Sequence, residues 1–179
     1  MTMALPTNRG NIDLYDLLFL LSSVSLGAFY YLLNINWSQR RIVIAIVGVE
    51  VAYFFYNLVF DQSPLFDSTA FVILSTGASI FIFMYMKQLL GNVGEESLLL
   101  NFDFWFVSGQ LIYHLGSFFI FLTFNYLTRK ILPDELYSQE NRGILTRLWG
   151  VHNVLLFLGS LLTTSGAIWI FSSKKWPSS

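Results

Sequence analysis

The sequence has no cysteine and few charged residues. The missing cysteines exclude disulfides, thiolate metal sites, iron–sulfur clusters and cysteine nucleophiles. Charged residues make up 12% of the 179-residue chain, whereas a soluble globular domain carries about 25%. So small a share cannot cover a surface of normal area that faces water, and lipid is the expected covering. The net charge of −1 gives no basic face for nucleic acid, so no nucleic-acid partner is expected.

Proline is absent from five long apolar stretches, which cover residues 12–33, 42–60, 68–90, 104–127 and 148–171. About 20 apolar residues suffice to cross a bilayer as a helix, and proline breaks the helical hydrogen-bond ladder. Only helices and closed barrels span lipid, and barrel strands are shorter alternating runs of about 10 residues. The sequence therefore predicts an all-α protein with one domain over residues 1–179 and five transmembrane helices in a lipid bilayer.

Basic residues do not decide which way the spans run. Five spans place the two termini on opposite sides of the membrane, and each side carries five Lys or Arg residues. The connection 61–67 has two acidic residues and no basic one, which favours the outside for the side that holds the N-terminus. We therefore expect the N-terminus outside and the C-terminus in the cytoplasm.

Several arrangements that carry chemistry in other proteins are missing. No lysine lies deep within an apolar stretch, since Lys87 is near the end of the stretch 68–90, and this excludes a retinal Schiff base. The sequence also has no phosphate-binding loop, no cluster of metal ligands, no paired carboxylates and no protease signature. It therefore predicts a non-enzymatic protein that holds neither a cofactor nor a metal ion.

Glu50 is the only formally charged residue deep within an apolar stretch. A charge at that depth costs at least about 2.5–3.5 kcal/mol, so the side chain must face the bundle, be neutral or have a partner. Asn57, seven residues further along, is expected on the same helix face. Glu50 is therefore a candidate for a polar site within the membrane.

His114 lies near the middle of the fourth stretch, at nearly the depth of Glu50. The second and fourth spans run in the same direction, so Glu50 and His114 can meet if these helices are neighbours. Gln110 and Ser117 share the face of His114 and would extend the network. Such an acid–imidazole pair can relay protons or bind a small polar ligand, whereas on a structural interpretation these groups only hold helices together.

The second histidine, His152, raises the question of a haem site. Counted from the expected start of the fifth span, His152 and His114 differ in depth by about nine residues, or roughly 13 Å. Two ligands of one iron cannot be so far apart, so ligation by both histidines is not expected. His152 and Asn153 are instead expected to form a polar pair at a helix end. Ligation of haem or chlorophyll by His114 alone stays open.

Small residues recur at a spacing of four in three of the stretches, and this spacing lets transmembrane helices approach closely. The sequence therefore predicts packing ridges in the first, third and fifth spans. Their members are Ser23 and Gly27, then Ser75 and Ser79, and finally Gly159, Thr163 and Ala167.

The segments FWFVSGQLIYHLGSFFIFLTFNYL and LWGVHNVLLFLGSLLTTSGAIWI resemble the last two spans of a set of short bacterial multi-spanning proteins. In that set, a span that begins with FW and contains G-x-L-I-Y is followed by a polar loop and a last span that begins near a tryptophan. Some members look like the membrane-embedded input part of signalling systems. The resemblance implies a bacterial inner membrane and a sensory role, and it supplies no catalytic residues. His114 departs from it, because an apolar or aromatic residue is expected there.

Three functions stay open on the sequence. The leading one is a non-enzymatic sensory or accessory module that acts through a partner chain or through self-association. The alternative is a small proton-coupled transporter that uses the pair Glu50 and His114. The third is a pigment- or haem-binding membrane subunit.

Overall fold

The computed structural model describes residues 9–33, 36–60, 67–91, 98–130 and 139–173. These residues form five α-helices and one short 3₁₀ turn, η1 (Leu98–Leu100). The helices are α1 (Arg9–Leu33), α2 (Trp37–Phe60), α3 (Ser68–Gly91), α4 (Phe102–Lys130) and α6 (Gln139–Ser173). Each helix contains a segment long and apolar enough to cross a membrane. The predicted all-α bundle of five membrane-spanning helices is confirmed.

Asparagine and aspartate side chains cap three of the helices at their N-termini. Asn36 precedes α2, Asp67 precedes α3 and Asn101 lies directly before α4. In each case the side-chain Oδ1 atom accepts a hydrogen bond from the backbone N–H two residues further on, at 2.8–3.1 Å. Such caps satisfy a backbone donor that has no partner within the helix. The cap at Asn36 lets α2 begin at Trp37, five residues before the predicted stretch.

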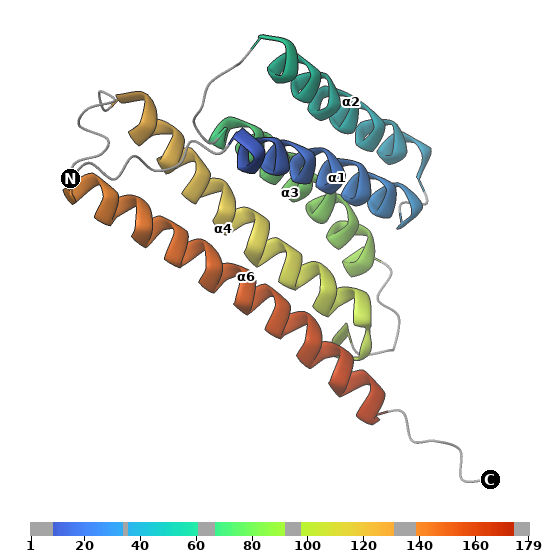
Figure 1. The fold of residues 1–179 in the computed structure, drawn as a ribbon. Helices are drawn as coiled ribbons and strands as arrows, with labels where there is room; N and C mark the ends of the chain where they lie inside the picture. The colour runs from blue at the N-terminus through green and yellow to red at the C-terminus, as the bar shows by residue number, and fades with distance from the viewer. Residues whose placement is uncertain (1–8, 34–35, 61–66, 92–97, 131–138, 174–179) are drawn as a thin grey trace.

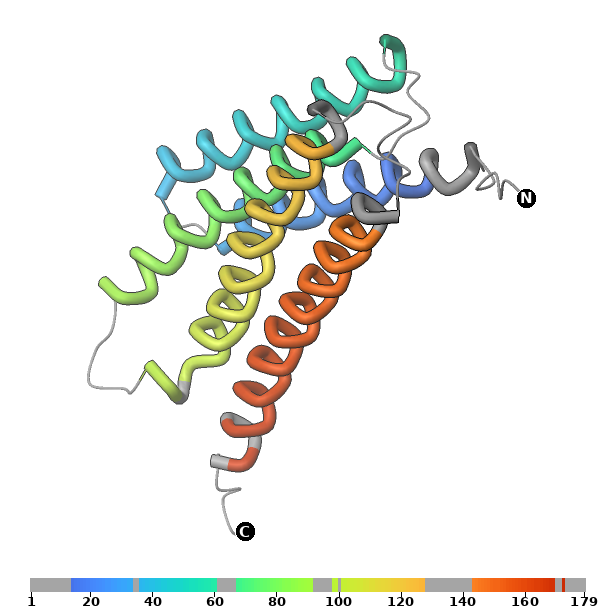
Figure 2. The backbone as a smooth tube through the Cα atoms, turned by 90° about the vertical axis from the view of Figure 1, so that its left-hand side faces the viewer, coloured from blue at the N-terminus to red at the C-terminus, as the bar shows by residue number. Residues whose placement is uncertain are grey.

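The helices pack as a three-helix group extended by a helix pair (Figure 1). Helices α1, α2 and α3 contact one another, α4 packs on α3, and α6 packs on α4. Figure 2 shows α4 and α6 side by side, with α2 at the opposite edge of the molecule. The central helix α3 is the most buried of the five, and the two edge helices α2 and α6 are the least buried.

Two apolar clusters hold the three-helix group at different depths. One cluster joins Tyr30 of α1, Val43 of α2 and Phe81 of α3, and it reaches α4. The other is built on Phe19 of α1 and Leu74 of α3. Phe19 and Tyr30 are about 16 Å apart along α1, at 1.5 Å per residue. The level between the two clusters is therefore left for other side chains, and the polar groups described below occupy it.

Helix α6 is longer than predicted. It begins at Gln139, and its candidate membrane span is Gly143–Trp169, whereas the apolar stretch began at residue 148. Arg142 and Arg147 interrupt the apolar pattern, but arginine is a good helix former and its long side chain can carry the charge to the membrane surface. His152 is consequently the fourteenth residue of α6 and does not lie near its start.

Candidate functional site

The carboxyl group of Glu50 is enclosed by three helices. Its side chain is 1% exposed. The hydroxyl of Ser23 on α1 donates a hydrogen bond to its Oε2 atom at 2.5 Å. Its Oε1 atom lies against Gly77 of α3, where a Cβ atom would clash with it, and has no hydrogen-bond partner among the described residues. Glu50 therefore ties α2 to α1 and packs on the bare backbone of α3.

The Glu50 site lies at the middle of the membrane-spanning region. Ser23, Glu50 and Gly77 are each within about three residues of the midpoint of their candidate spans. They fall between the two apolar clusters, which lie to either side along the helices. Enclosure by α1 and α3 keeps the carboxyl group away from lipid, where an ionisable group is costly.

His114 on α4 has partners of its own. It is 5% exposed, and its Nε2–H donates a hydrogen bond to the Oε1 atom of Gln110 at 3.2 Å. Its ring meets the ring of Tyr113 with centroids 4.9 Å apart. The condition for a contact between Glu50 and His114 was that their helices are neighbours, but Glu50 accepts from Ser23 and His114 bonds to Gln110. Helix α2 packs on α1 and α3, whereas α4 packs on α3 and α6, so equal depth does not make the two helices partners.

Two other residues predicted for this site belong to different contacts. The side-chain amide of Asn57 donates a hydrogen bond to the carboxylate of Asp67, beyond the level of Glu50. The hydroxyl of Ser117 is hydrogen-bonded to the Nδ1 atom of His152 at 3.2 Å. Of the five predicted residues, the structure joins only His114 and Gln110 by a hydrogen bond.

His152 is buried in the contact between α4 and α6. It is 8% exposed, and its ring lies 5.1–5.5 Å, between centroids, from the rings of Tyr113, Phe121 and Trp149. The expected pair of His152 with Asn153 at a helix end is wrong, since Asn153 is exposed and α6 begins thirteen residues earlier. The imidazole is held instead by an aromatic cage and by Ser117.

The predicted depth difference between the two histidines is also wrong. His152 is level with Ser117, which lies three residues, or about 4.5 Å, from His114 along α4. The early start of α6 causes this change. A haem held by both histidines still does not fit, because Tyr113 contacts both imidazoles, with ring centroids 4.9 and 5.5 Å away.

Ser117 and His152 have the spacing of a nucleophile and its base. Both side chains are buried, at 1% and 8% exposure, and neither lines either of the cavities described next. In the part of the chain that the structure describes, no three acidic, histidine or cysteine side chains gather in a position to hold a metal ion. We therefore read the pair as a polar contact between α4 and α6.

A cavity of about 380 Å³ lies between α1, α3 and α4, and we call it the central cavity. Its polar lining consists of Ser22, Ser25, Ser75, Gln110 and His114. The remaining lining side chains are apolar or aromatic: Leu21, Leu26, Phe71, Leu74, Tyr113 and Phe121. None of these residues carries a formal charge.

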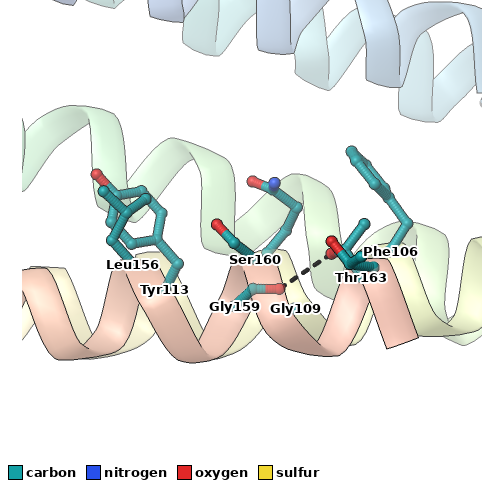
Figure 3. A pocket seen from close by; sticks show the side chains of 9 residues that line it. Phe106, Gly109, Tyr113, Leu156, Gly159, Ser160 and Thr163 are labelled. Carbon is teal, nitrogen blue, oxygen red and sulfur yellow. Dashed lines mark hydrogen bonds between the residues drawn. The ribbon is translucent and has the colours of Figure 1, made fainter. Parts of the chain in front are cut away.

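A second cavity of about 340 Å³ follows the contact between α4 and α6, and we call it the lateral groove (Figure 3). Gly109 and Gly159 let these helices approach closely, since a Cβ atom on Gly109 would lie 2.5 Å from the carbonyl oxygen of Gly159. Ser160 and Thr164 line the α6 side of the groove, and both are exposed. Gln110 lines both the lateral groove and the central cavity.

Comparison of the chain with protein-family profiles, curated proteins and solved structures gives no match. Its five candidate spans identify it as an integral membrane protein. The resemblance to short bacterial multi-spanning proteins stays a prediction. Any more specific function must therefore be argued from the two cavities and the Glu50 site.

Sequence reasoning missed the two residues that enclose Glu50. Ser23 was assigned to a packing ridge because Gly27 follows it at a spacing of four. One signal pointed to it, since Ser23 is central in the first span and consecutive spans with a short connection are usually neighbours. Gly77 gave no comparable signal. Its role depends on which face of α3 meets α2, and an apolar helix does not reveal that face.

Proposed function

We propose that the protein is a non-enzymatic sensory or accessory module of a bacterial inner membrane, and that it acts through a membrane-spanning helix of a partner chain. The lateral groove carries this proposal. It is a hollow of about 340 Å³ along α4 and α6, at the edge of the bundle, and exposed hydroxyl groups line one side.

The groove has the composition of a helix-packing surface. Transmembrane helices associate through small residues that permit close approach and through hydroxyl groups that bond across the contact. Lipid tails offer no partner for the hydroxyls of Ser160 and Thr164. A helix of another chain with small or polar residues on one face would fill the groove and bond to both hydroxyls. A contact between this groove and a span of the partner would pass a signal from one chain to the other within the membrane.

Photo-crosslinking in the native membrane tests this proposal. A photoreactive amino acid at Ser160 should crosslink to a different protein, at a peptide within one of that protein's transmembrane helices. The same group at Val49, which is 63% exposed on α2 and lies far from the groove, is the matched control. Crosslinks from Ser160 only to lipid, or only to a second copy of this chain, would overturn the proposal.

The alternative of a proton-coupled carrier loses the pair on which it was built, because Glu50 bonds to Ser23 and His114 bonds to Gln110. If the protein is a carrier, Glu50→Gln abolishes pH-dependent uptake into vesicles and leaves folding intact.

If the protein is instead a pigment-binding subunit, the purified protein shows a Soret or chlorophyll absorption band. A colourless preparation contradicts that alternative.

A further inference from the structure

Unpartnered polar groups gather in the central cavity. The hydroxyls of Ser22, Ser25 and Ser75 form no hydrogen bond with any described residue, although all three line the cavity. Other hydroxyls in the bundle behave differently: those of Thr76, Ser79, Thr123 and Thr163 each donate to the backbone carbonyl four residues earlier. The cavity hydroxyls are therefore available to a molecule inside it.

Gln110 and His114 add a donor and an acceptor to the same cavity. The Oε1 atom of Gln110 accepts from His114 Nε2–H, which leaves the side-chain amide of Gln110 with its two N–H donors. In that tautomer of the neutral imidazole, the Nδ1 atom of His114 is an acceptor without a partner among the described residues. The side chains of His114 and Ser75 are 5% and 3% exposed, so these two side chains lie deep in the cavity.

The cavity is polar at one level and aromatic at another. Phe71 and Phe121 line it with ring centroids 5.1 Å apart. Phe121 lies seven residues from His114 on α4, which is about 10 Å along the helix axis. The mouth lies at α1, where Leu21 and Ser25 line the cavity and are both exposed. A ligand would therefore enter sideways from lipid, with its polar end at His114 and its apolar part beside the phenylalanines.

We propose that the central cavity binds the head of an uncharged lipid alcohol, that is, a hydroxyl group on a long hydrocarbon tail. A hydroxyl donates to the Nδ1 atom of His114 and accepts from the amide of Gln110 or from Ser75. A charged head is excluded because no lining side chain carries a compensating charge. A volume of about 380 Å³ suits a head and the first part of a tail. This inference does not depend on the proposed partner helix, which would occupy the lateral groove.

Photoaffinity labelling of the full-length protein in lipid vesicles tests the proposal. Two tritiated lipid alcohols, each with a photoreactive group in its tail, serve as probes. One is a diacylglycerol and the other is an isoprenoid alcohol, so the two probes represent two classes of lipid that carry a hydroxyl head. Each is paired with its methyl ether, which lacks the hydroxyl hydrogen. We expect saturable labelling of peptides from α1, α3 or α4 by at least one alcohol. Its methyl ether should compete about tenfold more weakly, the effect of losing the hydrogen bond that the hydroxyl donates to His114.

Two variants distinguish binding in the central cavity from binding elsewhere on the protein surface. Ser75→Leu fills the cavity and should abolish saturable labelling, whereas Ser165→Leu, at an exposed serine on α6, should leave it unchanged. The comparison of alcohol with methyl ether uses the unaltered protein, so it holds even if Ser75→Leu does not fold. Equal competition by alcohol and ether would overturn the proposal, as would labelling that does not saturate or that maps only to α2 or α6.

Discussion

At the scale of single residues, Glu50 shows how a membrane bundle accommodates one carboxyl group. It lies near the midpoint of its candidate span, Ser23 and Gly77 enclose it, and only one of its oxygens has a hydrogen-bond partner among the described residues. Hydrogen bonds between transmembrane helices contribute modestly, about 0.6 kcal/mol on average in one measured system. The bond from Ser23 therefore joins α1 to α2 at a modest net gain in stability, whereas a buried carboxyl oxygen left without its donor costs more.

Loss of the Ser23 hydroxyl should destabilise the protein. Ser23→Ala leaves the second oxygen of Glu50 buried without a donor, which costs about 1–3 kcal/mol. Unfolding in increasing SDS, followed by tryptophan fluorescence, measures the difference. Ser165→Ala is the control, because Ser165 is exposed on α6, and it should unfold like the unaltered protein. Equal stability of the two variants would show that Ser23 does not support Glu50.

A side chain at position 77 should also disturb the Glu50 site. A Cβ atom there would clash with the Oε1 atom of Glu50 and lie 2.8 Å from Ile46. We expect Gly77→Ala to be about 1–3 kcal/mol less stable than Gly48→Ala in the same SDS titration. The control position has no atom within 4 Å of an added Cβ, so alanine there gains only its higher helix propensity. A Gly77→Ala protein as stable as the control would contradict the close contact of α2 with α3.

At the scale of helices, the contact between α4 and α6 depends on two facing glycines. A Cβ atom on Gly159 would lie 2.8 Å from the backbone carbonyl of Gly109, and a rigid backbone cannot give way as a side chain can. Gly159→Ala should therefore cost about 1–3 kcal/mol relative to Gly150→Ala, whose Cβ meets nothing within 4 Å on the same helix. SDS unfolding compares the two variants, and equal midpoints would mean that α6 does not pack on α4 through Gly159.

The spans were predictable from the sequence because lipid imposes one strong condition on each of them. About 20 apolar residues and the absence of proline identify a spanning helix without any knowledge of its neighbours. The start of α6 was not predicted correctly, because Arg142 and Arg147 interrupt the apolar run while the helix continues through them. That single error moved His152 by about nine residues and led to the wrong depth comparison with His114.

The partners of the polar residues were not predictable in the same way. Helices of low amphipathicity present apolar residues on every face, so the sequence does not show which face meets which neighbour. Depth alone matched Glu50 with His114, although Ser23 lies at a similar depth on a helix that does pack on α2. Only the pair of His114 and Gln110, which is local to one helix, was within reach of sequence reasoning.

At the scale of the whole molecule, the polar groups form a layer across the middle of the bundle. Glu50 and Ser23 lie at the side of α2, the central cavity lies between α1, α3 and α4, and the pair Ser117 and His152 lies at α6. Apolar clusters lie on either side of this layer within the three-helix group. A ligand in the central cavity would contact α1, α3 and α4 at once, and α4 also forms one wall of the lateral groove.

The orientation of this layer in the membrane leads to the last prediction. The connection 61–67 is acidic, so we expect the N-terminus outside and the C-terminus inside. The absence of native cysteine allows single cysteines to report it directly. In intact cells, a membrane-impermeant maleimide should label Thr2→Cys but label Ser178→Cys only after permeabilisation. Val49→Cys, in the middle of α2, should stay unlabelled in both conditions. The reverse pattern would invert the orientation, and labelling of both termini from one side would contradict five spans.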